Sequence, residues 1–474
     1  MAPLDSDVQV TGSGPRESTL PARAQSGRVR VPPRFWLRAI GLPQALRLSV
    51  CFAAIALREA LGRPFDAFAG SEGKAQRRVG RRSAAAQRVA RTLGDLKGPF
   101  AKAGQFASLR YDVLAPEVRA AFATLQDRVA PRPLAEITAV VEAELGVPLA
   151  ARFAEFEATP LGTASVAQVH RARLLGGEAV AVKVQFPWLA YSLRADLALA
   201  RLLLRALGGR KASPTRARLF DEFAASLAEE LDFEREARVA GEIAANLAGD
   251  PQVVVPTIHP ELSTRRVLVM SYLPAIPFAD RATLAQRGVP VRDVLATLAR
   301  AYAKQVFVDG LFHADPHPGN LFVIDEPDAS ASPRVLFIDF GLSKHLDPTL
   351  RRELRLGIHA LLRRDVEGFV DGMQRMGMIA PGARDGVRDA VAAMFERIRG
   401  EGQLLGFGGA QVLALKDQAK RLLEETPGLQ LPNQLLLYAK TMSYLFALGD
   451  QLAAGVDIMR ISAPYLLRFL AERE

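Results

Sequence analysis

The segment from His313 to Gly341 contains the residue types that phosphoryl transfer requires, in a suitable spacing. Asp315 and Asn320 lie in one Pro- and Gly-rich loop, and Asp339 begins an Asp-Phe-Gly triplet further on. In kinases the first of these acids orients or deprotonates the attacking hydroxyl, and the Asn and the second Asp hold Mg²⁺ at the phosphates. We therefore predict that Asp315 is catalytic and that Asn320 and Asp339 are Mg²⁺ ligands.

A kinase also needs a lysine on a strand upstream of this loop. Lys183 lies in the alternating stretch Val-Ala-Val-Lys-Val, residues 180–184, which is typical of a strand. We predict that Lys183 contacts the α- and β-phosphates of ATP. The strand predicted before it, residues 165–172, follows a loop of small residues that is expected to cover the phosphates. The residues of this loop assigned to the nucleotide are Gly162, Thr163, Ala164 and Ser165.

Two further segments complete the order of a kinase. Residues 223–246 are rich in Ala, Glu and Leu and are predicted to be helical, so they could supply the acid that pairs with the lysine. Residues 267–273 predict a buried strand that ends in a hinge against adenine, with Met270 and Leu273 as contact residues. Each acid of the helix could instead belong to a solvated face. The acids are Glu229, Glu230, Asp232, Glu234 and Glu236.

Two features of ordinary protein kinases are missing. Beyond Gly341 the sequence predicts a direct passage into a helix, without a long activation segment or an Ala-Pro-Glu anchor. Ala314 stands where a kinase controlled by phosphorylation has an arginine. We therefore expect a small or lipid-like phosphoryl acceptor, or ATP hydrolysis alone, in preference to protein phosphorylation.

Three segments resemble the UbiB-type (AarF-domain) atypical kinases, which include proteins that support ubiquinone biosynthesis. Lys-Ala-Gly-Gln at residues 102–105 is similar to the KxGQ element of that family, and Glu-Leu-Asp at residues 230–232 to its ExD element. Residues 160–169 are similar to the loop that the family makes Ala-rich. The resemblance covers roughly residues 95–350.

The resemblance implies roles for individual residues. Glu236 would be the helical partner of Lys183, and Glu230 and Asp232 would turn toward the KxGQ helix. Lys102 and Gln105 would cover the pocket through which a peptide substrate enters. Without the resemblance, Lys102 would be interpreted as a basic residue on an amphipathic helix.

One departure from the family concerns the phosphate loop. The family has Ala-Ala-Ala-Ser where this chain has Gly-Thr-Ala-Ser, residues 162–165. Glycine can adopt a positive φ and expose its N–H group to phosphate. We therefore expect Gly162 and Thr163 to change nucleotide affinity or selectivity, in a direction that the sequence leaves open.

The positive charge of the chain is concentrated near its N-terminus. The 474 residues contain 61 Lys and Arg and 51 Asp and Glu; residues 1–100 hold 17 and 7 of these, the whole difference of +10. The apolar stretch 45–61, followed by basic residues, could lie on an anionic membrane surface or pack on the kinase domain. No recognition motif supports nucleic-acid binding. The basic residues are Lys74, Arg77, Arg78, Arg81 and Arg82.

The sequence predicts an α+β, atypical protein-kinase-like fold of two lobes, with an N-terminal helical extension and a largely helical C-lobe. The predicted parts are a disordered basic segment at 1–33, the extension at 34–130, the N-lobe at 131–273 and the C-lobe at 274–474. No secretory signal or membrane-spanning run is recognised. With Cys51 as the single cysteine, a cytoplasmic location is expected, with peripheral contact at the inner face of the membrane left open.

The predicted function is an unorthodox kinase or ATPase of the UbiB type that uses Mg-ATP in isoprenoid-quinone or lipid metabolism. Its expected partners are ATP, quinone-biosynthesis proteins or lipid precursors, and anionic lipid. Two alternatives stay open. A small-molecule kinase of the aminoglycoside or choline kinase type has a similar catalytic loop but lacks KxGQ and ExD. A pseudokinase scaffold would bind nucleotide without turnover.

Overall fold

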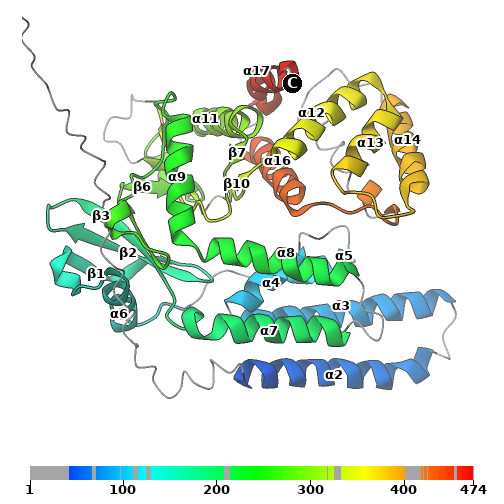
Figure 1. Cartoon of the computed structure of the whole chain (residues 1–474), viewed down its shortest axis with the longest axis horizontal. Coiled ribbons are helices and arrows are strands. Elements are labelled where there is room, and N and C mark those ends of the chain that lie inside the picture. Colours follow the sequence, from blue (N-terminus) through cyan, green and yellow to red (C-terminus); the bar gives the residue numbers. More distant parts are fainter. Residues whose placement is uncertain are drawn as a thin grey trace, which may run out of the picture.

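Two kinase-like lobes and a layer of long helices make up the computed structural model (Figure 1). The described residues are 42–66, 71–96, 98–108, 110, 116–123, 130–207, 214–317, 319–324, 332–400, 418–419, 421–423, 425–452 and 456–472. The segment 1–33, predicted to be disordered, lies outside them. The fold is mixed α+β with two lobes, as the sequence predicted.

The described part of the helical extension contains four helices that pack through small and apolar residues. Ala86, Ala90 and Ala121 form one small core with Phe122; side chains this short allow the helix backbones to approach closely. A second core contains Leu48, Leu96 and Phe100. One face of the first helix is therefore packed on protein. The helices are α2 (Leu42–Asp66), α3 (Ser71–Leu96), α4 (Pro99–Ser108) and α5 (Pro116–Ala123).

The N-lobe sheet has the strand order β1-β2-β3-β5, and all its neighbouring strands are antiparallel. Val180, Val182 and Val184 of β3 are fully buried in the core that includes Ile137 of helix α6. Because side chains alternate along a strand, Lys183 lies on the opposite face of the sheet. The elements are α6 (Leu134–Leu145), β1 (Phe153–Thr163), β2 (Ala167–Leu174), β3 (Ala179–Gln185) and β5 (Val267–Ser271).

Between β3 and the acidic helix the chain inserts the helices α7 (Leu189–Leu207) and α8 (Pro214–Glu230), which lie alongside the extension (Figure 1). The single helix predicted over residues 223–246 is wrong, since α8 ends at Glu230 and α9 (Phe233–Leu247) begins after a break. Asp232 causes the break: its side chain caps α9 by accepting a 3.0 Å hydrogen bond from the Arg235 N–H.

The C-lobe has its own sheet, of order β4-β9-β8-β6, and a short pair β7–β10. The catalytic loop connects β7 to β8, and the Asp-Phe-Gly triplet follows β9. The predicted direct passage from Gly341 into a helix needs one correction, because β10 comes before helix α12. The strands are β4 (Val253–Val254), β6 (Ala275–Pro277), β7 (Leu311–Phe312), β8 (Leu321–Ile324), β9 (Val335–Phe337) and β10 (Lys344–His345).

Helices surround this second sheet, and the last helix of the chain returns to it. Helix α17 lies against α11 (Figure 1), and its residue Ile458 belongs to the same buried core as Leu298, Tyr302 and Phe337. No helix within the described ranges is both long enough and apolar enough to cross a membrane. The helices are α10 (Arg281–Gln286), α11 (Val291–Ala303), α12 (Pro348–Arg363), α13 (Val366–Arg375), α14 (Arg384–Gly400), α16 (Asn433–Leu452) and α17 (Ile458–Ala471).

Candidate phosphoryl-transfer site

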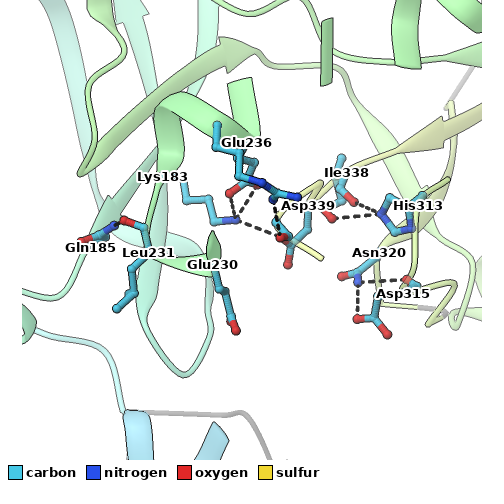
Figure 2. Close-up of polar contacts among 12 residues, drawn as sticks. Lys183, Gln185, Glu230, Leu231, Glu236, His313, Asp315, Asn320, Ile338 and Asp339 are labelled. Atoms are coloured by element: carbon cyan, nitrogen blue, oxygen red, sulfur yellow. Dashed lines mark hydrogen bonds and ion pairs between the residues drawn. The ribbon is translucent and has the colours of Figure 1, made fainter. Parts of the chain in front are cut away.

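Lys183 joins two carboxylates that come from different lobes. Its Nζ lies 2.7 Å from Oε1 of Glu236 on α9 and 2.9 Å from Oδ1 of Asp339, after β9 (Figure 2). Glu236 is 1% exposed. Among the helical acids left open by the sequence, the structure therefore pairs Glu236 with the lysine. A strand lysine in contact with a helical acid is the pair that a kinase needs at its nucleotide site.

One ammonium compensates two carboxylates in this cluster, and the pKa values reflect the imbalance. Burial raises the pKa of Glu236 to about 7, although the Lys183 charge opposes the rise and the Asp339 charge adds to it. Burial would also raise the pKa of Asp339, but the charges of Lys183 and Lys102 and the hydrogen bond from Lys183 lower it below its ordinary value. Burial opposes protonation of Lys183, yet the charges of Asp339 and Glu236 overcome burial and raise its pKa.

The Asp-Phe-Gly segment is held in an unusual backbone conformation. Asp339 has a φ of 61°, in the left-handed region that non-glycine residues rarely adopt. The buried His313 supports this turn, since its Nε2–H lies 3.1 Å from the Ile338 carbonyl and 2.9 Å from that of Asp339 (Figure 2). Its Nδ1 accepts a hydrogen bond of 3.2 Å from the Tyr302 hydroxyl. Burial, and then the Asp315 charge, raise the pKa of Tyr302, so the hydroxyl keeps its proton.

Gly341 lies close to the carboxylates that hold Lys183. A Cβ atom at this position would lie 3.4 Å from Asp339 Oδ1 and 3.5 Å from Glu236 Oε2. A side chain there would contact the two carboxylates that hold Lys183. These are ordinary van der Waals distances, so the space at this position would admit a Cβ atom.

Asp315 and Asn320 contact each other across the catalytic loop. The Asn320 amide donates to Asp315 Oδ2 at 2.9 Å and to the Asp315 main-chain carbonyl at 3.3 Å (Figure 2). A contact that the sequence analysis missed lies on the other oxygen: Lys440 Nζ is 2.8 Å from Asp315 Oδ1. Lys440 belongs to α16, 125 residues further along the chain, so no local spacing pointed to it.

The donor set suits Mg²⁺. Asp339 supplies a carboxylate whose side chain is 44% exposed, and the Asn320 amide, which donates through its nitrogen, has its oxygen as the ligand atom. Mg²⁺ prefers such oxygen ligands and keeps several waters, so two protein ligands suffice. The uncompensated charge of the Glu236–Asp339 pair also favours a cation at Asp339. Within the described residues no cluster of three His, Cys, Asp or Glu side chains forms a metal site of another kind.

The KxGQ and ExD elements meet through an ion pair. Lys102 Nζ of α4 lies 2.7 Å from Glu230 Oε1, at the C-terminal end of α8, with both side chains about 15% exposed. Lys102 is thus held at the site instead of lying on a solvated helix face. Asp232 caps α9, which carries Glu236. Gln105 lies one turn beyond Lys102 on α4, half-buried.

Gln185, a second residue that the sequence analysis did not single out, contacts the segment between α8 and α9. Gln185 lies on β3, two residues after Lys183, and its Nε2 donates to the Leu231 carbonyl at 2.6 Å and to the Arg265 carbonyl at 3.1 Å. The alternation of β3 could have revealed it, because Gln185 shares the face of Lys183. This polar contact ties the ExD element to the strand that carries the lysine.

The predicted phosphate loop is mostly strand. Gly162 and Thr163 end β1, and the turn follows at Ala164, whose N–H donates to the Ala167 carbonyl at 2.8 Å. Gly162 does not adopt the positive φ that was expected to expose its N–H group to phosphate. A Cβ atom at this position would meet nothing within 4 Å. Ser165 is buried, and no hydrogen-bond partner for its hydroxyl occurs in the described parts of the chain.

The predicted hinge lies at the end of β5. Met270 is buried and pairs with Ala181 of β3, two residues before the site lysine. Leu273 follows the strand and is half-buried. Met270 thus lies within an N-lobe strand and Leu273 just beyond its end, and their contact with adenine stays a prediction.

A family model and individual relatives match this chain. A model of the ABC1 atypical kinase-like domain matches residues 124–373. The chain is 32% identical over 397 residues to the probable protein kinase UbiB of Marinobacter nauticus, covering 81% of this chain and 70% of that protein. It is 33% identical over 403 residues to the uncharacterized protein sll0095 of Synechocystis, covering 83% and 69%.

A solved structure shares the fold. The structure of Rv3197 from Mycobacterium tuberculosis, determined in complex with erythromycin, is similar with a TM-score of 0.52 and 24% sequence identity, covering 85% of this chain and 100% of that one. The family match spans the strand lysine, the capped acidic helix, the catalytic loop and the Asp-Phe-Gly segment. The chain therefore belongs to the ABC1 atypical kinase-like family, which includes the UbiB proteins.

Proposed function

We propose that this protein binds Mg-ATP and transfers or hydrolyses its terminal phosphoryl group, as an unorthodox kinase or ATPase of the UbiB type. The observation that carries this proposal is the contact of Lys183 with both Glu236 and Asp339, beside the Asp315–Asn320 pair. Phosphoryl transfer asks the protein mainly for positioning and for compensation of charge. These residues can supply both.

Each residue has a defined task in this proposal. Glu236 orients Lys183, whose ammonium neutralises charge on the α- and β-phosphates. Asn320 and Asp339 would hold Mg²⁺, which supplies further neutralisation when bound. Asp315 accepts a hydrogen bond from the attacking hydroxyl or water and orients it toward the phosphorus.

The position of α4 favours a small acceptor, or water, over a peptide. Lys102 ties α4 to α8 beside the site, and only β10 separates Gly341 from α12. A peptide therefore lacks both an open entrance and an extended segment on which to dock. The relationship to the UbiB proteins suggests isoprenoid-quinone or lipid metabolism as the setting.

An exposed apolar stripe on α2 supports contact with a membrane surface. Leu46, Val50, Leu57 and Leu61 are 58–65% exposed, and spacings of four and seven residues place them on one side of the helix. This side faces away from the buried Leu48. The exposed Arg77, Arg78 and Arg82 of α3 follow. Such a pairing of apolar and basic surface fits an anionic lipid headgroup layer.

Phosphate release from ATP, with and without Mg²⁺, tests the proposed activity. We expect Mg²⁺-dependent release that falls by roughly 100-fold or more in Asp339→Asn, because a preorganised charge is lost. Asp221→Asn is the control, since that exposed acid on α8 lies in the insertion and forms a surface ion pair of 4.0 Å with Arg201, away from the site.

Other outcomes would change the proposal. Release by Asp339→Asn at the wild-type rate would contradict the metal-dependent mechanism. If the wild-type protein binds ATP but releases no phosphate in the presence of Mg²⁺ and anionic vesicles, a nucleotide-binding scaffold becomes the better description.

A further inference from the structure

Lys440 holds the carboxylate that the proposed mechanism assigns to the attacking group. Its Nζ lies 2.8 Å from Asp315 Oδ1, and both side chains are 24% exposed. The other carboxylate oxygen, Oδ2, accepts from the Asn320 amide at 2.9 Å. An ammonium on one oxygen and an amide on the other fix the plane of the carboxylate, while each oxygen keeps a further lone pair for a substrate hydroxyl.

Aromatic contacts fix the rotation of α16 at the level of Lys440. Tyr438 meets Phe312 edge-on, with ring centroids 6.1 Å apart, and Tyr444 lies 6.2 Å from His317. Phe312 precedes the catalytic Asp in the chain and His317 follows it. Contacts on both sides of Lys440 therefore anchor α16 to both ends of the same loop segment, which places the lysine opposite Asp315.

The site has a chemical need for this cation. The loop from Asp315 to Asn320 contains no Lys or Arg, and the ammonium of Lys183 already serves two carboxylates. A partly buried carboxylate beside a triphosphate would repel it. A positive charge in direct contact offsets this repulsion, and does so more strongly than in bulk water.

We propose that Lys440 is a positioning residue of the phosphoryl-transfer site, which holds the Asp315 carboxylate oriented toward the attacking hydroxyl or water. The inference rests on the proposed function. Lys440 lies beyond residue 373, where the match to the family model ends. A helix outside the kinase motifs thus completes the catalytic loop.

Steady-state phosphate release by Lys440→Met and Lys440→Arg tests this assignment. We expect Lys440→Met to lower kcat by about 10- to 100-fold, less than the roughly 100- to 10,000-fold of a lost acid or base, because Lys440 acts only through Asp315. The dissociation constant of Mg-ATP should rise by a smaller factor than kcat falls, because the lysine offsets repulsion at the catalytic loop but does not contact the nucleotide-binding lobe. Lys440→Arg should recover most of kcat, since a guanidinium keeps the charge and can reach the carboxylate.

Arg384→Met provides the matched control. Arg384 of α14 lies 2.6 Å from Asp371 of α13, so this variant also removes a cation–carboxylate pair from the helical lobe, away from the catalytic loop. It should leave kcat unchanged. Thermal unfolding of all variants separates a loss of kcat from a loss of folded protein.

Three results would overturn the inference. An unchanged kcat in Lys440→Met would remove Lys440 from the mechanism while leaving the proposed function intact. A loss that parallels unfolding, and that arginine does not restore, would assign a purely structural role. A wild-type protein without Mg²⁺-dependent turnover would overturn the proposed function and this inference with it.

Discussion

The Lys183 cluster concentrates two acids around one base, and this imbalance governs its behaviour. Glu236 comes from the N-lobe helix α9, whereas Asp339 follows a C-lobe strand, so the lysine also links the two lobes. Coupled groups of this kind titrate as a unit. The number of protons that the three groups bind together at a given pH is therefore the quantity to measure in the protein without nucleotide.

Glu236 makes the stability of the nucleotide-free and metal-free protein depend on pH. Its pKa is raised from 4.5 to about 7 on folding, so the folded state binds a proton that the unfolded state releases between these values. The contribution to stability is fully present below pH 4.5 and is lost as the pH rises through 7. We expect chemical denaturation to show this loss in the wild type and a flatter profile in Glu236→Gln.

The comparison uses the difference between the two profiles, because other groups titrate in both proteins. A shift of this size corresponds to on the order of 3 kcal/mol. Identical slopes for wild type and Glu236→Gln between pH 4.5 and 7 would contradict the raised pKa.

At the scale of elements, an ion pair between Lys102 and Glu230 joins α4 to α8. Lys102→Met leaves Glu230 partly buried without its cation, a loss that typically costs more than a surface pair. We expect faster local opening of α4, seen as roughly 5- to 30-fold faster amide exchange in residues 99–108. Exchange in α12 should not change.

Arg91→Met is the control for that experiment. Arg91 is an exposed basic residue on the neighbouring helix α3, whose guanidinium donates to the Gln87 carbonyl of its own helix. Equal acceleration of α4 exchange by both substitutions would show that the Lys102–Glu230 contact does not hold the helix.

The end of β1 gives a second prediction at this scale. Gly162 does not use a positive φ, and its missing side chain would meet open space. Gly162→Ala should therefore leave the fold intact and raise stability by about 0.5–1 kcal/mol, since alanine loses less backbone entropy on folding. Thermal unfolding checks this, and a destabilised protein would show that the strand end needs glycine.

At the scale of the whole molecule, α2 lies at an outer edge of the structure (Figure 1) and carries the exposed apolar stripe, and α3 carries exposed arginines. Leu46→Gln together with Leu57→Gln should weaken sedimentation with vesicles containing anionic phospholipid by about tenfold or more, because two exposed leucine side chains that would enter the lipid layer are lost. Raised salt should weaken the binding of the wild type as well.

Leu175→Gln is the matched control, since Leu175 is equally exposed, at 63%, on the turn after β2. It should leave vesicle binding unchanged. Equal binding by the wild type and the α2 double variant would assign the stripe to something other than a lipid surface.

The sequence by itself determined the two-lobed kinase-like fold and the short segments that carry chemistry. The strand of Lys183, the catalytic loop and the Asp-Phe-Gly triplet are each local, because their function depends on a few residues at fixed spacing along one strand or turn. The prediction of one acidic helix over residues 223–246 is wrong, because composition favours helix throughout this range. Composition does not reveal that Asp232 caps a second helix within it.

Only the tertiary structure decided which side chains meet across large separations. It selected Glu236 from several acids, because the start of α9 fixes which face of the helix points to β3. It joined Lys102 to Glu230 and brought Lys440 to Asp315 from 125 residues away. These contacts depend on the rotation and packing of whole helices, which no local pattern of residues records.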